Sequence, residues 1–162
     1  MAALLYGALP KTSHVPTEVA LSAATVKTVV QVATPSTREI VVFGWGISFD
    51  GASASAEPVV CTLNDVDVAA TVTSLTPEAW GSSASPASLC PGGTSATGYN
   101  ASAEGSITGS RMLDHQNVHP QTGYSVWFPA DSRPRIAVSR FLRLRANAPA
   151  AVNALGWIVW QE

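Results

Sequence analysis

The strongest constraint on this chain is a repeated pattern of short runs rich in β-branched residues, separated by turn-forming residues roughly every ten positions. No segment of a dozen residues shows the periodicity of about 3.6 residues that marks an amphipathic helix. Such runs are typical of an antiparallel β-sandwich. We expect strands at residues 17–23, 25–34, 38–49, 57–66, 69–76, 110–118, 123–130, 138–148 and 151–162. Asn64 and Asp65 are turn candidates, and Pro149 is expected to lie in the turn of a final hairpin.

The length and the composition along the chain indicate one domain. A chain of 162 residues is long enough to bury roughly 70% of its unfolded surface. We expect a single all-β sandwich over residues 16–162, preceded by an N-terminal arm at residues 1–15. Residues 81–110 are nearly all small and polar, which predicts a long surface loop, at about residues 77–109, without a core of its own. This long crossing, with a final strand apolar on both faces, favours jelly-roll over immunoglobulin-like wiring.

The strand at residues 38–49 carries two glycines where a sheet should be strongest. By the period of two, one face should lie in the core, and this face carries Val41, Phe43, Trp45, Ile47 and Phe49. The opposite face carries Gly44 and Gly46 beside apolar residues. This pattern has two explanations, a β-bulge or the close approach of a loop, of the N-terminal arm or of another subunit.

Charge is scarce, at 12% of residues against about 25% in ordinary soluble domains. The net charge of −2 argues against non-specific binding to nucleic acid. A surface of Ala, Ser, Thr and Gly suits contact with other protein subunits, although a neutral coat on a free protein is the alternative. The one charge cluster is arginine-rich and includes Arg140, Arg143 and Arg145, of which the last two alternate with leucines. These arginines form either a solvated face or a row that pairs with carboxylates on a partner.

The chain shows no constellation that carries chemistry. His115 and His119 lie about 13 Å apart in a strand, too far to share a metal ion. There is no G-x-S-x-G elbow and no phosphate-binding loop, so we expect no enzyme, no catalytic residue, no cofactor and no metal. Cys61 and Cys90 are expected to be free thiols, with a disulfide as the alternative. We expect neither a secretory signal nor a membrane span.

Five blocks, in one order, resemble a family of small virion proteins of tailed bacteriophages that infect actinobacteria. They are LLYGALP, ATPSTREIVVFGWGISFDG, GTSATGYNASAEGSIT, GYSVWFPADSRP and SRFLRLRANAPAAVNALGWIVWQE. The members resemble capsid decoration (cement) proteins. The resemblance implies a protein made in the host cytoplasm and added to the outer surface of the expanded head, commonly as a trimer. It implies no catalytic residues.

On this basis we expect contacts with copies of the chain, in a homotrimer, and with the major capsid protein. The residues expected at these contacts are Leu4, Leu5, Tyr6, Gly44, Gly46, Arg140, Arg143, Arg145, Trp157 and Trp160. The competing function is a carbohydrate-binding module on a tail or head appendage. That module would use exposed aromatic side chains, for which Trp80, Tyr99 and Trp127 are the candidates.

Overall fold

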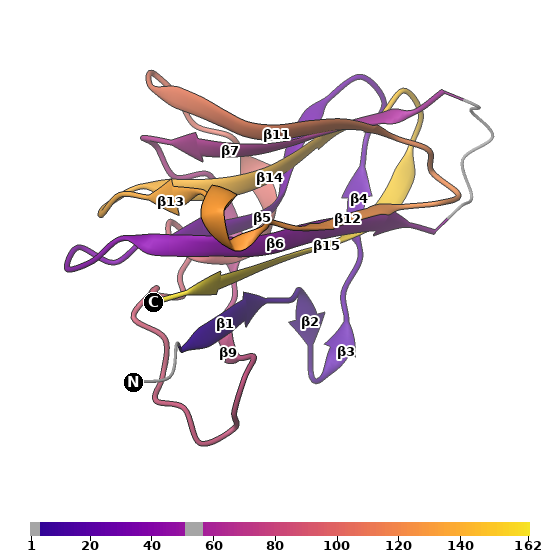
Figure 1. Cartoon of the computed structure of the whole chain (residues 1–162). Helices are drawn as coiled ribbons and strands as arrows, with labels where there is room; N and C mark the ends of the chain where they lie inside the picture. Colours follow the sequence, from indigo (N-terminus) through magenta and orange to yellow (C-terminus); the bar gives the residue numbers. More distant parts are fainter. Residues whose placement is uncertain (1–3, 51–56) are drawn as a thin grey trace.

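The computed structural model describes residues 4–50 and 57–162. Two large antiparallel β-sheets pack face to face, and a small two-stranded sheet lies beside them (Figure 1). In this part of the chain the helical content is one short 3-10 turn, Ala130–Ser132. Strand propensity and the alternation of apolar residues explain this outcome, because β-branched and aromatic side chains pack well on a pleated, half-buried surface. The prediction of an all-β sandwich is confirmed.

The first sheet has the strand order β12-β6-β15-β1-β9, with β13 also pairing with β6 and β4 also pairing with β15. Its strands are β1 (Leu5–Ala8), β4 (Val19–Leu21), β6 (Ile40–Phe49), β9 (Glu78–Ala79), β12 (Tyr124–Trp127), β13 (Arg135–Ile136) and β15 (Val152–Gln161). Because β1 and β4 pair with different halves of β15, the sheet is interrupted between them.

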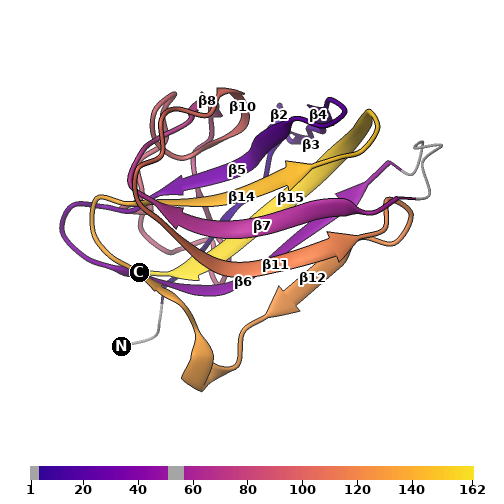
Figure 2. The ribbon, with the colours of Figure 1, turned by 90° about the horizontal axis from the view of Figure 1, so that it is seen from above.

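The second sheet has the strand order β11-β7-β14-β5-β10-β8 and lies across the first (Figure 2). Its strands are β5 (Val26–Ala33), β7 (Val59–Val66), β8 (Thr71–Ser74), β10 (Gly98–Ala103), β11 (Ser110–Val118) and β14 (Phe141–Asn147). A separate small hairpin joins β1 to β4 and consists of β2 (Lys11–Thr12) and β3 (Val15–Pro16). Its two turn residues, Ser13 and His14, both have positive φ, as a type I′ turn requires.

The core lies between the two sheets and is dominated by large side chains. Trp45 of β6 and Trp160 of β15 are fully buried, and Tyr6 of β1 packs against Trp160 with 6.5 Å between ring centroids. The indole N–H of Trp45 donates to the Asp114 carboxylate at 3.0 Å. Buried aromatic rings contribute large apolar areas to stability, and the hydrogen bond removes the cost of burying the indole nitrogen.

A β-bulge in β6 changes which of its residues face the core. Along the β6–β15 ladder Val159 pairs with Gly44 but Trp160 pairs with Val42, so Phe43 is the extra residue. Ile40 and Val42 are therefore fully buried, whereas Val41 and Phe43 are only partly buried. The prediction that Val41 and Phe43 face the core was wrong, because a bulge inverts the alternation on one side of it.

The N-terminal segment is part of the sandwich. Strand β1 lies between β15 and β9, and both Tyr6 and Ala8 are buried. Of the predicted arm at residues 1–15, only the β2–β3 hairpin projects from the sheet (Figure 1), and residues 1–3 lie outside the described residues. The expectation of an arm outside the sandwich domain therefore does not hold for residues 5–8.

Three other local expectations need correction. The predicted loop at residues 77–109 contains β9 and β10, and β10 extends the second sheet by pairing with β5 and β8. Asn64 and Asp65 lie within β7 and not in a turn. Strands β14 and β15 belong to different sheets, so the turn at Pro149 connects the two layers and forms no hairpin.

Candidate functional site

Three tryptophans from separate parts of the chain meet on the outer face of the first sheet. Trp80 follows β9, Trp127 ends β12 and Trp157 lies in β15. The ring centroids of Trp80 and Trp127 are 6.2 Å apart, and those of Trp127 and Trp157 are 5.3 Å apart. We call these three residues the tryptophan patch.

Each tryptophan of the patch covers a glycine of the sheet. A Cβ atom on Gly46 would stand 2.5 Å from the Trp157 ring, and one on Gly44 would stand 3.0 Å from the Trp127 ring. Gly7 of β1 would meet the Trp80 ring at 3.1 Å. The glycines therefore let the rings lie close to the backbone, as in other sheets where an aromatic side chain covers a glycine. Strand β6 does bulge, but at Phe43 and not at a glycine. The close approach expected at the glycines is present, but it is made by tryptophan side chains of the same chain and not by a loop, the N-terminal arm or a subunit.

The patch is only partly buried. Trp80 is 47% exposed and Trp127 is 51% exposed, while Val159, which pairs with the covered glycines Gly44 and Gly7, is fully buried. Two adjacent half-exposed tryptophans are unusual on a free surface, because they leave apolar area in water. Tryptophan is also among the residues most enriched at the energetic centre of protein interfaces. The patch is the strongest candidate for a binding surface in the described part of the chain.

The patch contains two of the three aromatic residues that we expected in a carbohydrate-binding module. Trp80 and Trp127 lie together, but Tyr99 is only 5% exposed and belongs to β10 of the second sheet. The contact of Trp157 with this pair was not predicted from the sequence. The sequence did contain an indication that Trp157 lies on the outer face. The alternation of faces along residues 151–162 puts Trp157 on the face opposite to the core residue Trp160.

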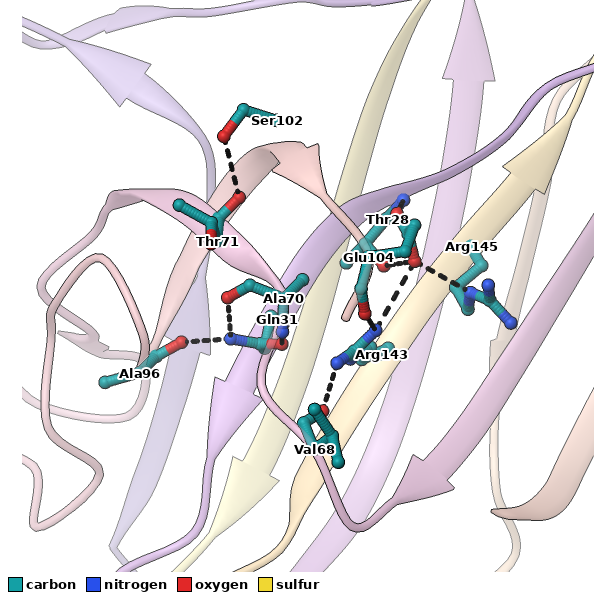
Figure 3. Close-up of polar contacts among 10 residues, drawn as sticks. All are labelled: Thr28, Gln31, Val68, Ala70, Thr71, Ala96, Ser102, Glu104, Arg143 and Arg145. Carbon is teal, nitrogen blue, oxygen red and sulfur yellow. Dashed lines mark hydrogen bonds and ion pairs between the residues drawn. The ribbon is translucent and has the colours of Figure 1, made fainter. Parts of the chain in front are cut away.

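The arginine row is not a free surface. Arg143 is fully buried and donates to the backbone carbonyls of Val68 and of Glu104, at 2.8 Å for the second (Figure 3). The Glu104 carboxylate lies 3.4 Å from Arg143 Nη1 and 3.1 Å from Arg145 Nε. Burial lowers the pKa of Arg143, and the Glu104 carboxylate opposes this effect. The expectation that Arg143 projects toward a partner was wrong, because the segment after β7 folds back over it.

The segment that follows β7 is hydrogen-bonded to β5 at two further points, Thr28 and Gln31. The chain itself therefore covers this half of the second sheet. Thr28 donates to Glu104 through its backbone N–H at 2.5 Å and its hydroxyl at 2.8 Å. The Gln31 side chain accepts from Ala70 N–H at 2.8 Å and donates to the Ala96 carbonyl at 2.6 Å (Figure 3). Gln31 is itself fully buried, so these bonds satisfy an amide that would be costly to leave unpaired.

The other arginines are also separated from one another. Arg140, just before β14, forms an ion pair with Asp65 of β7 at 2.8 Å. The Arg133 guanidinium lies 3.6 Å from the centroid of the Phe43 ring on the first sheet. These arginines have partners within the chain, so they do not form the continuous docking row that the sequence suggested.

The remaining predicted contact residues divide between core and surface. Tyr6 and Trp160 are core residues, and the Tyr6 hydroxyl donates to the Pro86 carbonyl at 3.0 Å. Leu4, just before β1, and Leu5, its first residue, are partly buried. Of the predicted residues, Trp157 is the one whose side chain forms part of the exposed patch.

The side chain of Glu162 occupies a cradle of hydrogen-bond donors. Its carboxylate accepts from the Ser88 hydroxyl, from Leu89 N–H at 2.7 Å, from Cys90 N–H at 3.3 Å and from Trp160 Nε1 at 3.1 Å. Burial raises the pKa of Glu162, but these hydrogen bonds outweigh burial and hold the pKa below its ordinary value of 4.5. The cradle ties the loop before β10 to the end of β15.

Both cysteines are free and buried. Burial raises the pKa of Cys61 to about 12. Burial and the nearby Glu162 carboxylate also raise the pKa of Cys90. Because the thiolate is the reactive form, neither thiol is suited to nucleophilic or redox chemistry in the folded protein.

Within residues 4–50 and 57–162, no group of three or more His, Cys, Asp or Glu side chains is placed to hold a metal ion. No helix in the same residues has the length and apolar character of a membrane span. Comparisons with models of protein families, with curated proteins and with solved structures found no match to the chain.

Proposed function

We propose that this chain is a non-enzymatic structural protein of a tailed-phage virion that decorates the outside of the head and docks through the tryptophan patch. The single observation that carries the docking surface is the contact of Trp80, Trp127 and Trp157 on a half-exposed sheet face. The assignment to a virion is supported by the resemblance of five sequence blocks to phage decoration proteins. The major capsid protein is the partner in this proposal.

The strand order supports a jelly-roll wiring for this domain. Taking β4, β5, β6, β7, β11, β12, β14 and β15 as the eight principal strands, the first sheet contains strands one, eight, three and six in that order. The second sheet contains strands two, seven, four and five. This alternation of the eight principal strands between the two sheets supports jelly-roll wiring, a fold common in viral capsid proteins.

A homotrimer is part of the proposal. Strand β11 is nine residues long and lies at the edge of the second sheet, so its outer side presents backbone groups that β7 does not pair. Natural proteins cover long edge strands or prevent them from pairing with another chain. A closed symmetric assembly is one way to cover them. The low charge of the chain, 12% of residues, fits a surface with neighbouring subunits.

The docking proposal is tested on undecorated heads with the variant Trp80→Ala/Trp127→Ala. Truncating residues at the centre of an interface costs about 2 kcal/mol or more, so we expect the Kd for heads to rise at least about thirtyfold. The matched control is Leu89→Ala, because Leu89 is also 47% exposed but lies outside the patch. Unchanged occupancy of the heads by the double variant contradicts the docking surface. Failure of the unaltered chain to bind heads contradicts the proposed function.

A carbohydrate-binding appendage is the second candidate, because exposed tryptophans also stack on sugar rings. The geometry of the patch does not suit a flat polysaccharide. The rings of Trp80 and Trp127 are inclined by 49°, and those of Trp127 and Trp157 by 37°, so they do not form one plane. If the isolated chain binds an extended polysaccharide and the double variant does not, the second candidate replaces the first.

A further inference from the structure

A groove lies beside the tryptophan patch, at the point where the first sheet is interrupted. Strand β4 pairs with Val152–Ala154, and strand β1 pairs with Ile158–Gln161. In the described structure, the residues between these two stretches, 155–157, therefore pair with β6 on one side and with no strand on the other. The β2–β3 hairpin connects β1 to β4 beside this interruption and stands out from the sheet (Figure 1). The space between the hairpin and β15 is a groove of about 500 Å³.

The walls of this groove combine apolar surface with a few polar groups. Trp157 and Leu155 form the β15 side, and Pro16 contributes from the hairpin. The polar side chains of the groove belong to Lys11, His14, Ser48 and Glu78, and Lys11 forms an ion pair with Glu78. A volume between about 300 and 1,000 Å³ with mainly apolar walls and a few fixed polar groups is typical of a small-molecule site.

A second hollow continues from the same ion pair. It has a volume of about 410 Å³ and shares Lys11, His14 and Glu78 with the groove. Its other lining residues include Ser13, Ser74 and Thr76, so its walls carry hydroxyl groups. The ion pair thus lies between one apolar space and one hydroxyl-lined space, and a ligand longer than one ring can contact both.

We propose that these two hollows form a binding site for a neutral saccharide of at least two pyranose units. A pyranose has an apolar C–H face, which suits the Trp157 wall, and hydroxyl groups that both donate and accept hydrogen bonds. Lys11 offers donors only and Glu78 offers acceptors only, so the pair satisfies both functions of a hydroxyl. The pair cancels its own charge, which favours a neutral ligand over a phosphate or a carboxylate. The proposal does not rest on docking to a phage head.

An extended peptide is the competing occupant. A peptide that adds to a sheet gains affinity from a ladder of main-chain hydrogen bonds along a free edge. The interrupted edge here is only three residues long, from Leu155 to Trp157. Such a short edge supports little of a ladder, so a compact ligand with several hydroxyl groups fits the site better.

The test uses the full chain, with ¹H–¹⁵N spectra recorded during titration with methyl β-D-glucopyranoside and with a panel of neutral disaccharides, namely cellobiose, maltose and lactose. We expect a disaccharide to shift the indole N–H signal of Trp157 and the amide signals of Lys11 and Leu155, and to leave that of the core residue Trp45 unchanged. Because a disaccharide contacts both hollows, we expect its Kd to be about tenfold lower than the Kd of the monosaccharide.

The variant Lys11→Met tests the polar contact. Its ion pair is exposed, so its loss leaves the fold intact. We expect the Kd for the best disaccharide to rise about tenfold, while Leu89→Ala, outside both hollows, leaves it unchanged. The site is wrong if no disaccharide shifts these signals at millimolar concentration, or if a peptide shifts them instead. It is also wrong if Trp80→Ala/Trp127→Ala abolishes sugar binding and Lys11→Met does not, because the sugar then binds on the patch.

Discussion

Trp157 lies directly opposite Gly46 across the β6–β15 ladder, and its ring occupies the space where a side chain at position 46 would stand. The glycine does not weaken the sheet at this point, because the indole covers the backbone that the missing side chain leaves open. The same ring contacts Trp127 and lines the groove beside the β2–β3 hairpin. One cross-strand pair therefore positions both proposed binding surfaces.

Replacing Gly46 with alanine tests this relationship. The new Cβ would stand 2.5 Å from the Trp157 ring, so the ring has to move away from β6. We expect a loss of about 1–3 kcal/mol in the free energy of unfolding, the usual cost of overpacking, measured by urea denaturation. The control is Gly81→Ala, because a Cβ there meets no atom within 4 Å. Equal stability of the two variants contradicts the close contact.

Glu104 is expected to be essential for stability, because it is the carboxylate that faces the buried Arg143. The substitution Glu104→Gln keeps the shape and removes the charge. Breaking a buried ion pair by removing one partner costs about 3–5 kcal/mol in the free energy of unfolding. Because Glu104 is partly exposed, we expect a loss near the lower value.

The control for Glu104 is Glu39→Gln, which breaks the exposed pair with Arg135 and is expected to cost less than about 1 kcal/mol. Thermal or urea unfolding compares the two variants. A loss in Glu104→Gln no larger than in the control would show that Arg143 is adequately satisfied by the Val68 and Glu104 carbonyls.

The cradle around Glu162 predicts a dependence of stability on pH. The pKa of Glu162 in the folded protein lies below its ordinary value of 4.5. Its contribution to stability is therefore present above that ordinary value and is lost as the pH falls through the folded pKa. We expect Glu162→Gln to be less stable than the unaltered chain at neutral pH, with a difference that shrinks as the medium becomes acidic. Urea midpoints measured across this range check the slope, with the exposed Glu18→Gln as control.

The thiols are expected to be unreactive until the protein unfolds. Burial raises the pKa of Cys61 to about 12 and also raises that of Cys90. We expect no reaction with a thiol reagent at mildly alkaline pH in the native state and reaction of both thiols in denaturant. Rapid labelling of the native protein contradicts their burial, and failure to label after unfolding indicates a disulfide.

The strands of the sandwich could largely be predicted from local pattern. The expected run at residues 110–118 coincides with β11, and the run at residues 57–66 overlaps β7. Strand β10 was missed because its residues are small and polar. It forms because β5 and β8 pair with it on both sides, and this environment is absent from the local sequence.

The candidate site was predicted less well than the fold. Exposed aromatic residues were expected at Trp80 and Trp127, but nothing in the sequence places them 6.2 Å apart. The prediction that the arginine row forms a docking surface was wrong for a related reason. Alternation puts Arg143 on the outer face of its strand, yet whether that face meets water depends on a segment some forty residues earlier in the chain, which carries Glu104.

The sequence by itself determined that this chain forms short antiparallel strands around an apolar core, because strand propensity and the period of two act between neighbouring residues. Only the tertiary structure decided which residues are exposed at the surface. The bulge at Phe43 reverses the faces of β6, and the covered Arg143 and the gathered tryptophans depend on contacts between distant segments. Those contacts form only when the two sheets close, so no local pattern contains them.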